Sequence, residues 1–185
     1  MIICLGCSKP EEASRRADVQ VQCLSTEARA SSIVLPDSHW LKVSNHTVEK
    51  WAPSGEKAWS VETPSKETPL PGVSVAANNT VYMRDKQRLL ALSSKGAWLW
   101  ERPEPIQGAT DASYYPAAMS DSGVVLRTER MKYRAYSPTG VLRWTSEVEL
   151  KGPPIEKPLI LPNGAIIIRS AENFVAIGPE DGVAL

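Results

Sequence analysis

The sequence holds few residues of the kinds that usually carry catalysis or bind metal. Its only histidines, His39 and His46, lie seven residues apart. Neither has a second histidine or a cysteine at the spacings typical of zinc ligands. The sequence also contains no nucleophile elbow, phosphate-binding loop or dinucleotide fingerprint. We therefore expect both histidines to be surface or turn residues, and we expect no metal and no cofactor.

One set of charged residues recurs at a regular interval. A basic residue follows an apolar run four times, at spacings of 42, 43 and 42 residues: Lys42, Arg84, Arg127 and Arg169. If each run belongs to one unit of a rotational repeat, the four cations lie at equivalent positions around one axis. Such a basic ring suits an anionic ligand or the acidic side chains of a partner protein. The alternative is that these residues are solvated strand ends, or are paired with carboxylates of adjacent units.

The elements that must position these residues follow an internal repeat. A Gly-x-x-x-Trp sequence occurs three times, and its glycine returns a fourth time, at intervals of 41, 44 and 42 residues. With eleven Gly and six Trp in 185 residues, fewer than one such pair is expected by chance. The motif residues are Gly55, Trp59, Gly96, Trp100, Gly140, Trp144 and Gly182.

Each unit contains about four short strand-like runs bounded by turn residues. A period of about 42 residues with four strands is typical of a β-propeller blade. We therefore predict an all-β fold, a β-propeller made of four-stranded blades, with the first blade degenerate and the last truncated. The four blades are expected at residues 31–62, 72–103, 115–147 and 157–185. A β-sandwich with coincidental glycines and tryptophans is the alternative.

The run from Leu90 through Gly96 to Trp100 resembles the tryptophan-docking repeat of pyrroloquinoline-quinone-type propellers, and the resemblance extends over residues 31–185. In that family the tryptophan docks between adjacent blades and the glycine serves a turn, so the resemblance implies structural roles for the motif residues. Propellers of that family have more blades than the four found here. We therefore expect an incomplete propeller that is closed by further blades or by an oligomer.

The N-terminal residues resemble the end of a bacterial lipoprotein signal, because an apolar run leads to a Leu-Gly-Cys sequence ending at Cys7. In such signals the sulfur of this cysteine takes a diacylglycerol. The resemblance is partial, since a basic segment is missing and Cys4 stands where leucine is usual. We expect residues 1–7 to be a partial signal and residues 8–30 a flexible tether. An ordinary N-terminus with a chance cysteine is the alternative.

Charge and resemblance together lead to an expected function. Lys plus Arg and Asp plus Glu both number 21, so the formal charge is zero, which argues against a nucleic-acid binder. We expect a non-enzymatic scaffold for another protein or an anionic ligand, on the periplasmic or cell-surface face of a bacterial membrane, touching that membrane only through a lipid anchor. It resembles, at the level of the fold, the lipid-anchored propellers that assist outer-membrane protein assembly. The alternative is a fragment of a quinone-dependent dehydrogenase or another quinoprotein enzyme.

Overall fold

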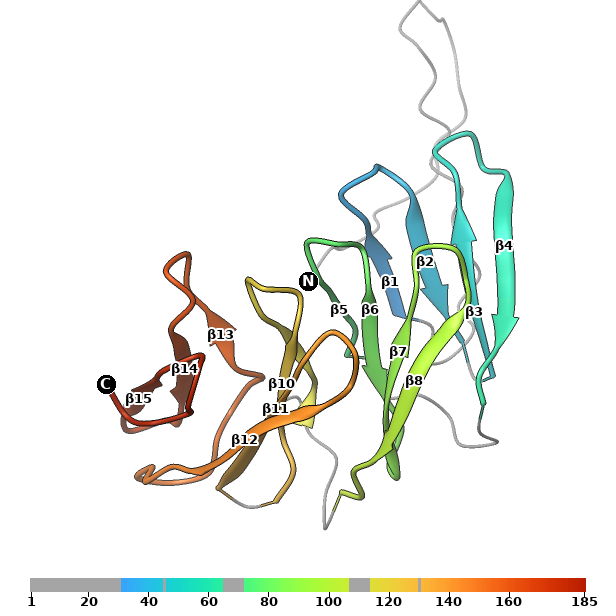
Figure 1. Cartoon of the computed structure of the whole chain (residues 1–185). Coiled ribbons are helices and arrows are strands. Elements are labelled where there is room, and N and C mark those ends of the chain that lie inside the picture. Colours follow the sequence, from blue (N-terminus) through green and yellow to red (C-terminus); the bar gives the residue numbers. More distant parts are fainter. Residues whose placement is uncertain (1–30, 45, 65–71, 107–113, 130) are drawn as a thin grey trace, which may run out of the picture.

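The computed structural model describes residues 31–44, 46–64, 72–106, 114–129 and 131–185. The regular elements of these residues are fifteen β-strands, which form four antiparallel sheets (Figure 1). The predicted all-β fold is therefore confirmed. The expected signal at residues 1–7, with Cys7, and the expected tether at residues 8–30 lie outside the described residues.

Each sheet corresponds to one copy of the sequence repeat, and the sheets are here named blades 1 to 4. Blade 1 contains β1 (Ser31–Val34), β2 (Trp40–Val43), β3 (Thr47–Trp51) and β4 (Lys57–Glu62). Blade 2 contains β5 (Ser74–Val75), β6 (Val81–Arg84), β7 (Arg88–Leu92) and β8 (Trp98–Pro103). Blade 3 contains β9 (Ala117–Ala118), β10 (Val124–Arg127), β11 (Lys132–Tyr136) and β12 (Leu142–Glu147). Blade 4 contains β13 (Leu159–Ile160), β14 (Ile166–Arg169) and β15 (Phe174–Ile177).

Strand order within every blade follows the chain, so each blade is a simple antiparallel meander. Tight turns make this possible, and the motif glycines Gly55, Gly96, Gly140 and Gly182 all have positive φ angles in them. Blade 4 has three strands where the others have four. Ala184 forms an isolated bridge with Ile177, on the side of β15 where the other blades pair their fourth strand.

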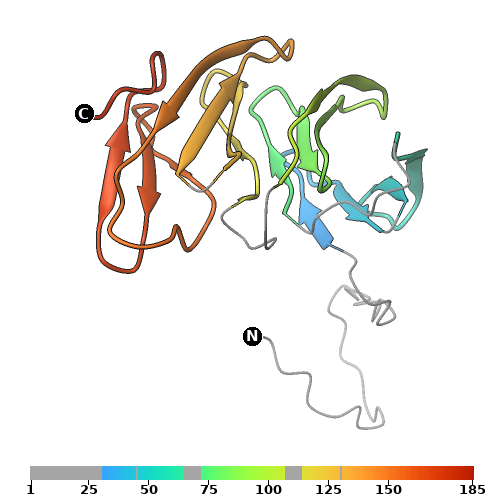
Figure 2. The same cartoon turned by 90° about the horizontal axis from the view of Figure 1, so that it is seen from below.

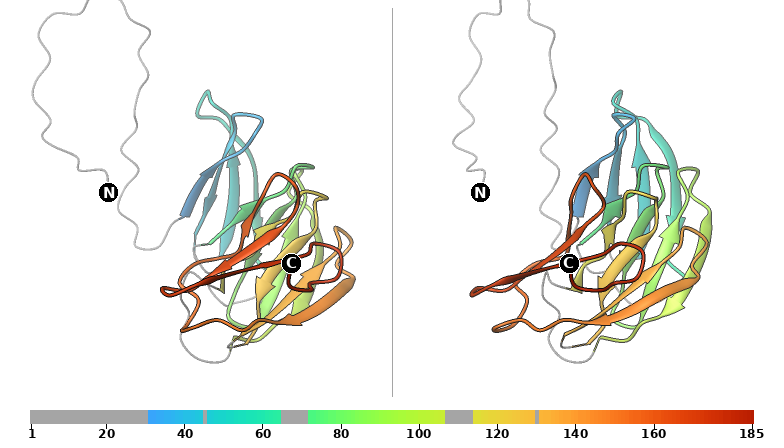
Figure 3. Two further views of the ribbon diagram at one scale, coloured as in Figure 1. Left: turned by 90° about the vertical axis from the view of Figure 1, so that its left-hand side faces the viewer. Right: turned by 60° about the vertical axis from the view of Figure 1, so that its left-hand side comes forward.

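The blades stand face to face in an open fan, with blade 1 at one end and blade 4 at the other (Figure 2). Seen from the blade 4 end, the sheets follow one behind another (Figure 3). The short first strands lie on the inner side of the fan, because β9 contacts both β5 and β13. This is the arrangement of a β-propeller, in which each blade packs against its neighbours.

Burial along the second strand of each blade reflects the stacking. Every residue of β6 and β10 is buried, because blades 2 and 3 are covered on both faces. In β2, by contrast, buried residues alternate with half-buried ones, and β14 likewise has one covered face. Three apolar clusters fill the seams between consecutive blades. We call the side of a blade that meets the preceding blade its leading face and the opposite side its trailing face.

Candidate functional site

The Gly-x-x-x-Trp motif joins each blade to the next one. Trp59 of blade 1 reaches across the seam, and its indole Nε1 donates a hydrogen bond of 3.1 Å to the carbonyl of Ser94 in blade 2. The indole also lies on Gly96, where an added Cβ would come within 2.9 Å of the ring. Glycine is therefore needed at this position both for its positive φ of 81° and for the space that the tryptophan occupies.

The same contact recurs at the two later seams. Trp100 Nε1 donates to the carbonyl of Pro138 at 2.8 Å, and Trp144 Nε1 donates to the carbonyl of Pro179 at 2.9 Å. An added Cβ on Gly140 or on Gly182 would come within 2.7 Å of the indole that rests there. Each of the three tryptophans thus combines a hydrogen bond with apolar contact in holding two blades together.

Gly55 is the exception among the four motif glycines. Its φ is 83°, like the others, but no described atom lies within 4 Å of an added Cβ. Its turn belongs to blade 1, at the end of the fan, so no described tryptophan rests on it.

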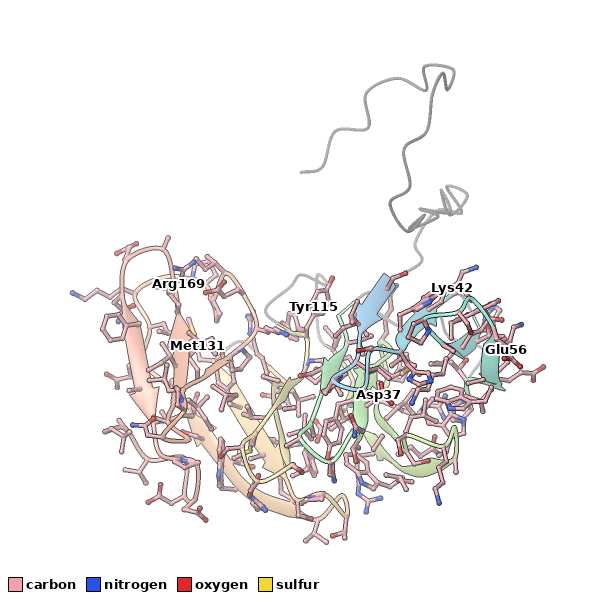
Figure 4. The ribbon with its side chains drawn as sticks, turned by 90° about the horizontal axis from the view of Figure 1, so that it is seen from above. Asp37, Lys42, Glu56, Tyr115, Met131 and Arg169 are labelled. Carbon is pink, nitrogen blue, oxygen red and sulfur yellow. The ribbon has the colours of Figure 1, made fainter. Side chains whose placement is uncertain are left out.

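The register of the strands separates Lys42 from the other three basic residues. Arg84, Arg127 and Arg169 are the last residues of β6, β10 and β14, and the last residue of β2 is Val43. Lys42 precedes Val43 and so lies on the opposite face of its sheet, since neighbouring residues of a strand point to opposite faces. The expectation that Lys42 is equivalent to the arginines is therefore wrong. Figure 4 shows Lys42 and Arg169 at opposite ends of the fan.

Arg84 is fully buried, so it does not line an accessible mouth of the propeller. Its Nη1 donates to the carbonyls of Arg127, at 2.8 Å, and Tyr114, at 3.3 Å, and its Nη2 donates to the carbonyl of Glu104. Burial lowers the pKa of Arg84 to about 10, so the guanidinium stays charged at neutral pH. The expected basic ring is therefore corrected: this cation binds backbone carbonyls within the fold.

The remaining two arginines also have partners within the chain. Arg127 is buried, lies 4.4 Å from the centre of the Tyr114 ring, and donates from Nε to the carbonyl of Glu129 at 3.1 Å. Arg169 is exposed and pairs with Glu156 at 3.0 Å. The three arginines therefore differ in environment although they share one position of the repeat.

Glu104 is the centre of a polar cluster in the seam between blades 2 and 3. The residue is 2% exposed, and its two carboxylate oxygens accept hydrogen bonds from Arg134 Nη1 at 2.9 and 3.0 Å. The Tyr136 hydroxyl donates to the same carboxylate, while the Glu104 carbonyl accepts from Arg84. A buried carboxylate needs such partners to offset its lost hydration. This cluster binds the two blades together.

Both histidines lie between strands of blade 1. His39 precedes β2, and its Nδ1 lies 3.2 Å from the carbonyl of Asp37, while the exposed His46 precedes β3. In the part of the chain that the structure describes, no group of three or more His, Cys, Asp or Glu side chains is placed to hold a metal ion. No helix among the described residues is long and apolar enough to cross a membrane.

The trailing face of blade 4 is an apolar surface that no other blade of the described residues covers. Leu159 is 57% exposed and Phe174 is 68% exposed, and Ile167 and Ala176 between them are half-buried. The side chains of blade 2 that match Ile167, Phe174 and Ala176 are Tyr82, Leu89 and Ala91, and all three are fully buried against blade 3. We call this surface the trailing end face and define it by five residues: Leu159, Ile167, Arg169, Phe174 and Ala176.

The leading face of blade 1, at the other end of the fan, is aromatic and charged. Trp40 and Trp51 stack with ring centres 5.4 Å apart and planes 11° apart. Lys57 Nζ lies 5.1 Å from the centre of the Trp51 ring and pairs with Glu49 at 2.7 Å. This hydrogen bond from Lys57 holds the pKa of Glu49 below its usual value. We call this surface the leading end face and define it by Trp40, Lys42, Glu49, Trp51 and Lys57.

The fold places the chain among the β-propeller proteins, and comparison with known proteins agrees. Among solved structures, the chain is similar to a streptogramin B lyase, with a TM-score of 0.65 and 14% identity over 87% of this chain. BamB from Moraxella catarrhalis matches with a TM-score of 0.63 and 16% identity over 85% of this chain. The C-terminal WD40 domain of Sif2 matches with a TM-score of 0.68 and 10% identity over 84%.

At these identities the likeness establishes the fold. The chain spans about half the length of these solved propellers: 55% of the streptogramin B lyase, 50% of BamB and 44% of the Sif2 domain. No family model matches the chain, and no curated protein is similar to it in sequence.

Proposed function

We propose that the protein is a non-enzymatic scaffold that binds another protein through its trailing end face. The observation that carries the proposal is the exposure of Leu159 and Phe174 at repeat positions that are buried in the inner blades. Exposure of apolar side chains to water is unfavourable in free energy. Contiguous exposed apolar surface is therefore typical of sites where proteins associate. A protein partner fits this surface better than an anionic ligand, because its exposed side chains are mainly apolar and its one arginine, Arg169, already pairs with Glu156.

We further propose that a lipid on Cys7 holds the scaffold to the periplasmic or cell-surface face of a bacterial membrane. The support is the Leu-Gly-Cys sequence that ends at this residue, and the likeness of the fold to BamB is consistent with it. Replacing Cys7 by serine is expected to move the protein from the membrane fraction to the soluble fraction and to abolish labelling by radioactive palmitate. Membrane retention of the serine variant would contradict the anchor.

Partner binding is tested by affinity capture of the full chain from the cells that produce it. Phe174→Glu places a charge on the trailing end face, so it is expected to abolish recovery of the partner. Val141→Glu is the matched control, since Val141 is also exposed but lies in a turn of blade 3 away from that face. Equal recovery of the partner with the parent chain, Phe174→Glu and Val141→Glu would refute the proposed binding surface.

An enzymatic role is the second candidate, and the observation that favours it is the fold shared with a streptogramin B lyase. The quinoprotein class that the repeat resembles belongs to the same alternative. Purified protein that carried quinone absorbance, or that had lyase activity on a streptogramin B, would establish an enzyme in place of a scaffold.

A further inference from the structure

The seam between blades 2 and 3 shows how a trailing face and a leading face fit together. On the trailing face of blade 2, Tyr82 pairs with Ala91, and Arg84 pairs with Leu89 in the neighbouring strand. On the leading face of blade 3, Val124 pairs with Tyr136, and Leu126 pairs with Arg134. The apolar members of these two faces form one buried cluster.

The trailing end face repeats the blade 2 pattern position by position. Ile167 pairs with Ala176 as Tyr82 pairs with Ala91, and Arg169 pairs with Phe174 as Arg84 pairs with Leu89. Ile167, Ala176 and Phe174 therefore stand where the inner seam buries its apolar side chains. The trailing end face therefore has the residue types of a face that is covered by a following blade, as the trailing face of blade 2 is covered by blade 3.

The leading end face repeats the blade 3 pattern with different residue types. Trp40 pairs with Trp51 as Val124 pairs with Tyr136, and Lys42 pairs with Glu49 as Leu126 pairs with Arg134. Two large aromatic rings thus replace a valine and a tyrosine. Tryptophan is among the residues most enriched at protein interfaces, because its large ring is apolar but keeps a polar N–H group.

From this correspondence, and resting on the proposed function, we infer that the partner of the trailing end face is the leading end face of a second copy of this chain. In the inner seam, Arg84 and Arg134 both bind Glu104, so their two positions lie close together. The same two positions at the ends of the fan hold Arg169 and Glu49, which carry opposite charges. The end faces are therefore complementary in charge as well as in apolar contact.

Gly55 supports the same pairing. The three other motif glycines each carry an indole from the preceding blade, and the surface over Gly55 is open. The open surface over Gly55 therefore leaves room on blade 1 for a side chain of a second copy.

Two copies related by a two-fold axis form two identical seams, and closed symmetric assemblies of this kind are the commonest oligomers. Each copy contributes four blades. Each spans about half of the solved propellers that resemble it. The head-to-tail pair covers the trailing and leading end faces of both copies.

The pairing is tested by sedimentation equilibrium on the full chain carrying Cys7→Ser, which keeps it unlipidated. We expect twice the mass of one chain. Phe174→Glu on the trailing end face is expected to weaken dimerisation by about 100- to 10,000-fold, since one buried aromatic contact, about 10- to 100-fold, is lost in each of the two seams. Val141→Glu is expected to leave the mass unchanged. A cooperative thermal unfolding transition of the Phe174→Glu monomer would show that its blades remain folded.

A charge exchange distinguishes the head-to-tail arrangement from other dimers. Glu49→Arg and Arg169→Glu are each expected to weaken the dimer, and the double variant is expected to restore it. A dimer that responds to Phe174→Glu but not to Glu49→Arg would overturn the head-to-tail pairing in favour of two trailing faces. A monomeric chain that still captures a different protein through Phe174 would overturn the inference and leave the proposed function intact. A monomer that captures none would overturn both.

Discussion

Adding one methyl group at Gly140 is expected to destabilise the fold far more than the same change at Gly55. The φ angle is 77° at Gly140 and 83° at Gly55, in the left-handed region that disfavours residues with a Cβ. Alanine at either position is therefore expected to destabilise the fold by about 1–2 kcal/mol through the backbone alone. At Gly55 the new Cβ meets no described atom within 4 Å, and the cost ends there. At Gly140 the Cβ would come within 2.7 Å of the Trp100 ring, which must move away.

Displacing Trp100 removes its hydrogen bond to Pro138, which contributes about 1 kcal/mol. It also removes part of the indole from the seam, at about 1–2 kcal/mol. We therefore expect Gly140→Ala to lower the free energy of unfolding by about 3–5 kcal/mol and Gly55→Ala by about 1–2 kcal/mol. The difference between the two variants measures the docked tryptophan alone, since the backbone penalty is common to both.

The measurement is urea unfolding followed by far-ultraviolet circular dichroism. Both glycine variants are made in a Phe174→Glu chain, so that association of copies through Gly55 does not contribute. Equal destabilisation by the two substitutions would refute the reasoning, because it would mean that the tryptophan contributes nothing to the seam. A change in the slope of unfolding against urea would indicate that single blades unfold separately.

Two further predictions concern charged groups. Glu104→Gln removes the carboxylate that Arg134 and Tyr136 bind in the seam, so we expect it to lower the free energy of unfolding in urea by about 3 kcal/mol. Glu101→Gln, which removes an exposed partner of Arg88, is expected to cost less than about 1 kcal/mol, and similar losses would contradict a special role for Glu104. The pKa of Glu49 is lowered from 4.5 in the folded chain by its hydrogen bond from Lys57, so this contact stabilises the fold above about pH 4.5 and its contribution is lost as the pH falls through the folded pKa. Thermal unfolding of a Glu49→Gln variant is therefore expected to depend less on pH between 5 and about 3 than that of the parent chain, and parallel curves would contradict this.

The strands and blades were predictable from the sequence because their signals are local. Apolar runs such as Val81–Arg84 alternate with turn residues, and the glycine interval sets the length of one blade. The contact of each tryptophan with the next blade is different, since Trp59 and the Ser94 carbonyl are 35 residues apart. No local pattern encodes which surface the indole meets. Only the assembled stack of blades brings Trp59 onto Gly96.

The basic ring shows how a small error in register changes a prediction. Lys42 and Arg84 are 42 residues apart, whereas Gly55 and Gly96 are 41 apart, and this single residue moves Lys42 to the opposite face of its sheet. Over all four units, however, the spacing to the motif glycine does not show the shift, because Lys42, Arg127 and Arg169 each lie 13 residues before that glycine and Arg84 lies 12 before it; only the strand pairing separates Lys42 from the arginines. The position of Glu104 could not be found from spacing either, because it lies beyond β8 and its partners come from another blade.

The end faces did leave a signal in the sequence. Lys42 and Glu49 of blade 1 occupy the positions of Met83 and Leu90 in blade 2, so two residues of opposite charge replace an apolar pair on the leading face. The same positions in blade 3 hold Leu126 and Arg134, so the oppositely charged pair distinguishes blade 1 from both of these blades. Its meaning depends on the three-dimensional stack, which shows that this face and the surface around Phe174 are the two ends of the fan.

The central claim is that the trailing end face works by contact with protein, and cross-linking from that face tests it most directly. A photoreactive amino acid is placed at Phe174 in the producing cells, and at Val141 as a control of similar exposure. Irradiation is expected to yield discrete covalent protein adducts from position 174, including the chain itself, and none from position 141. No adduct at position 174, or the same adducts at both positions, would contradict the account.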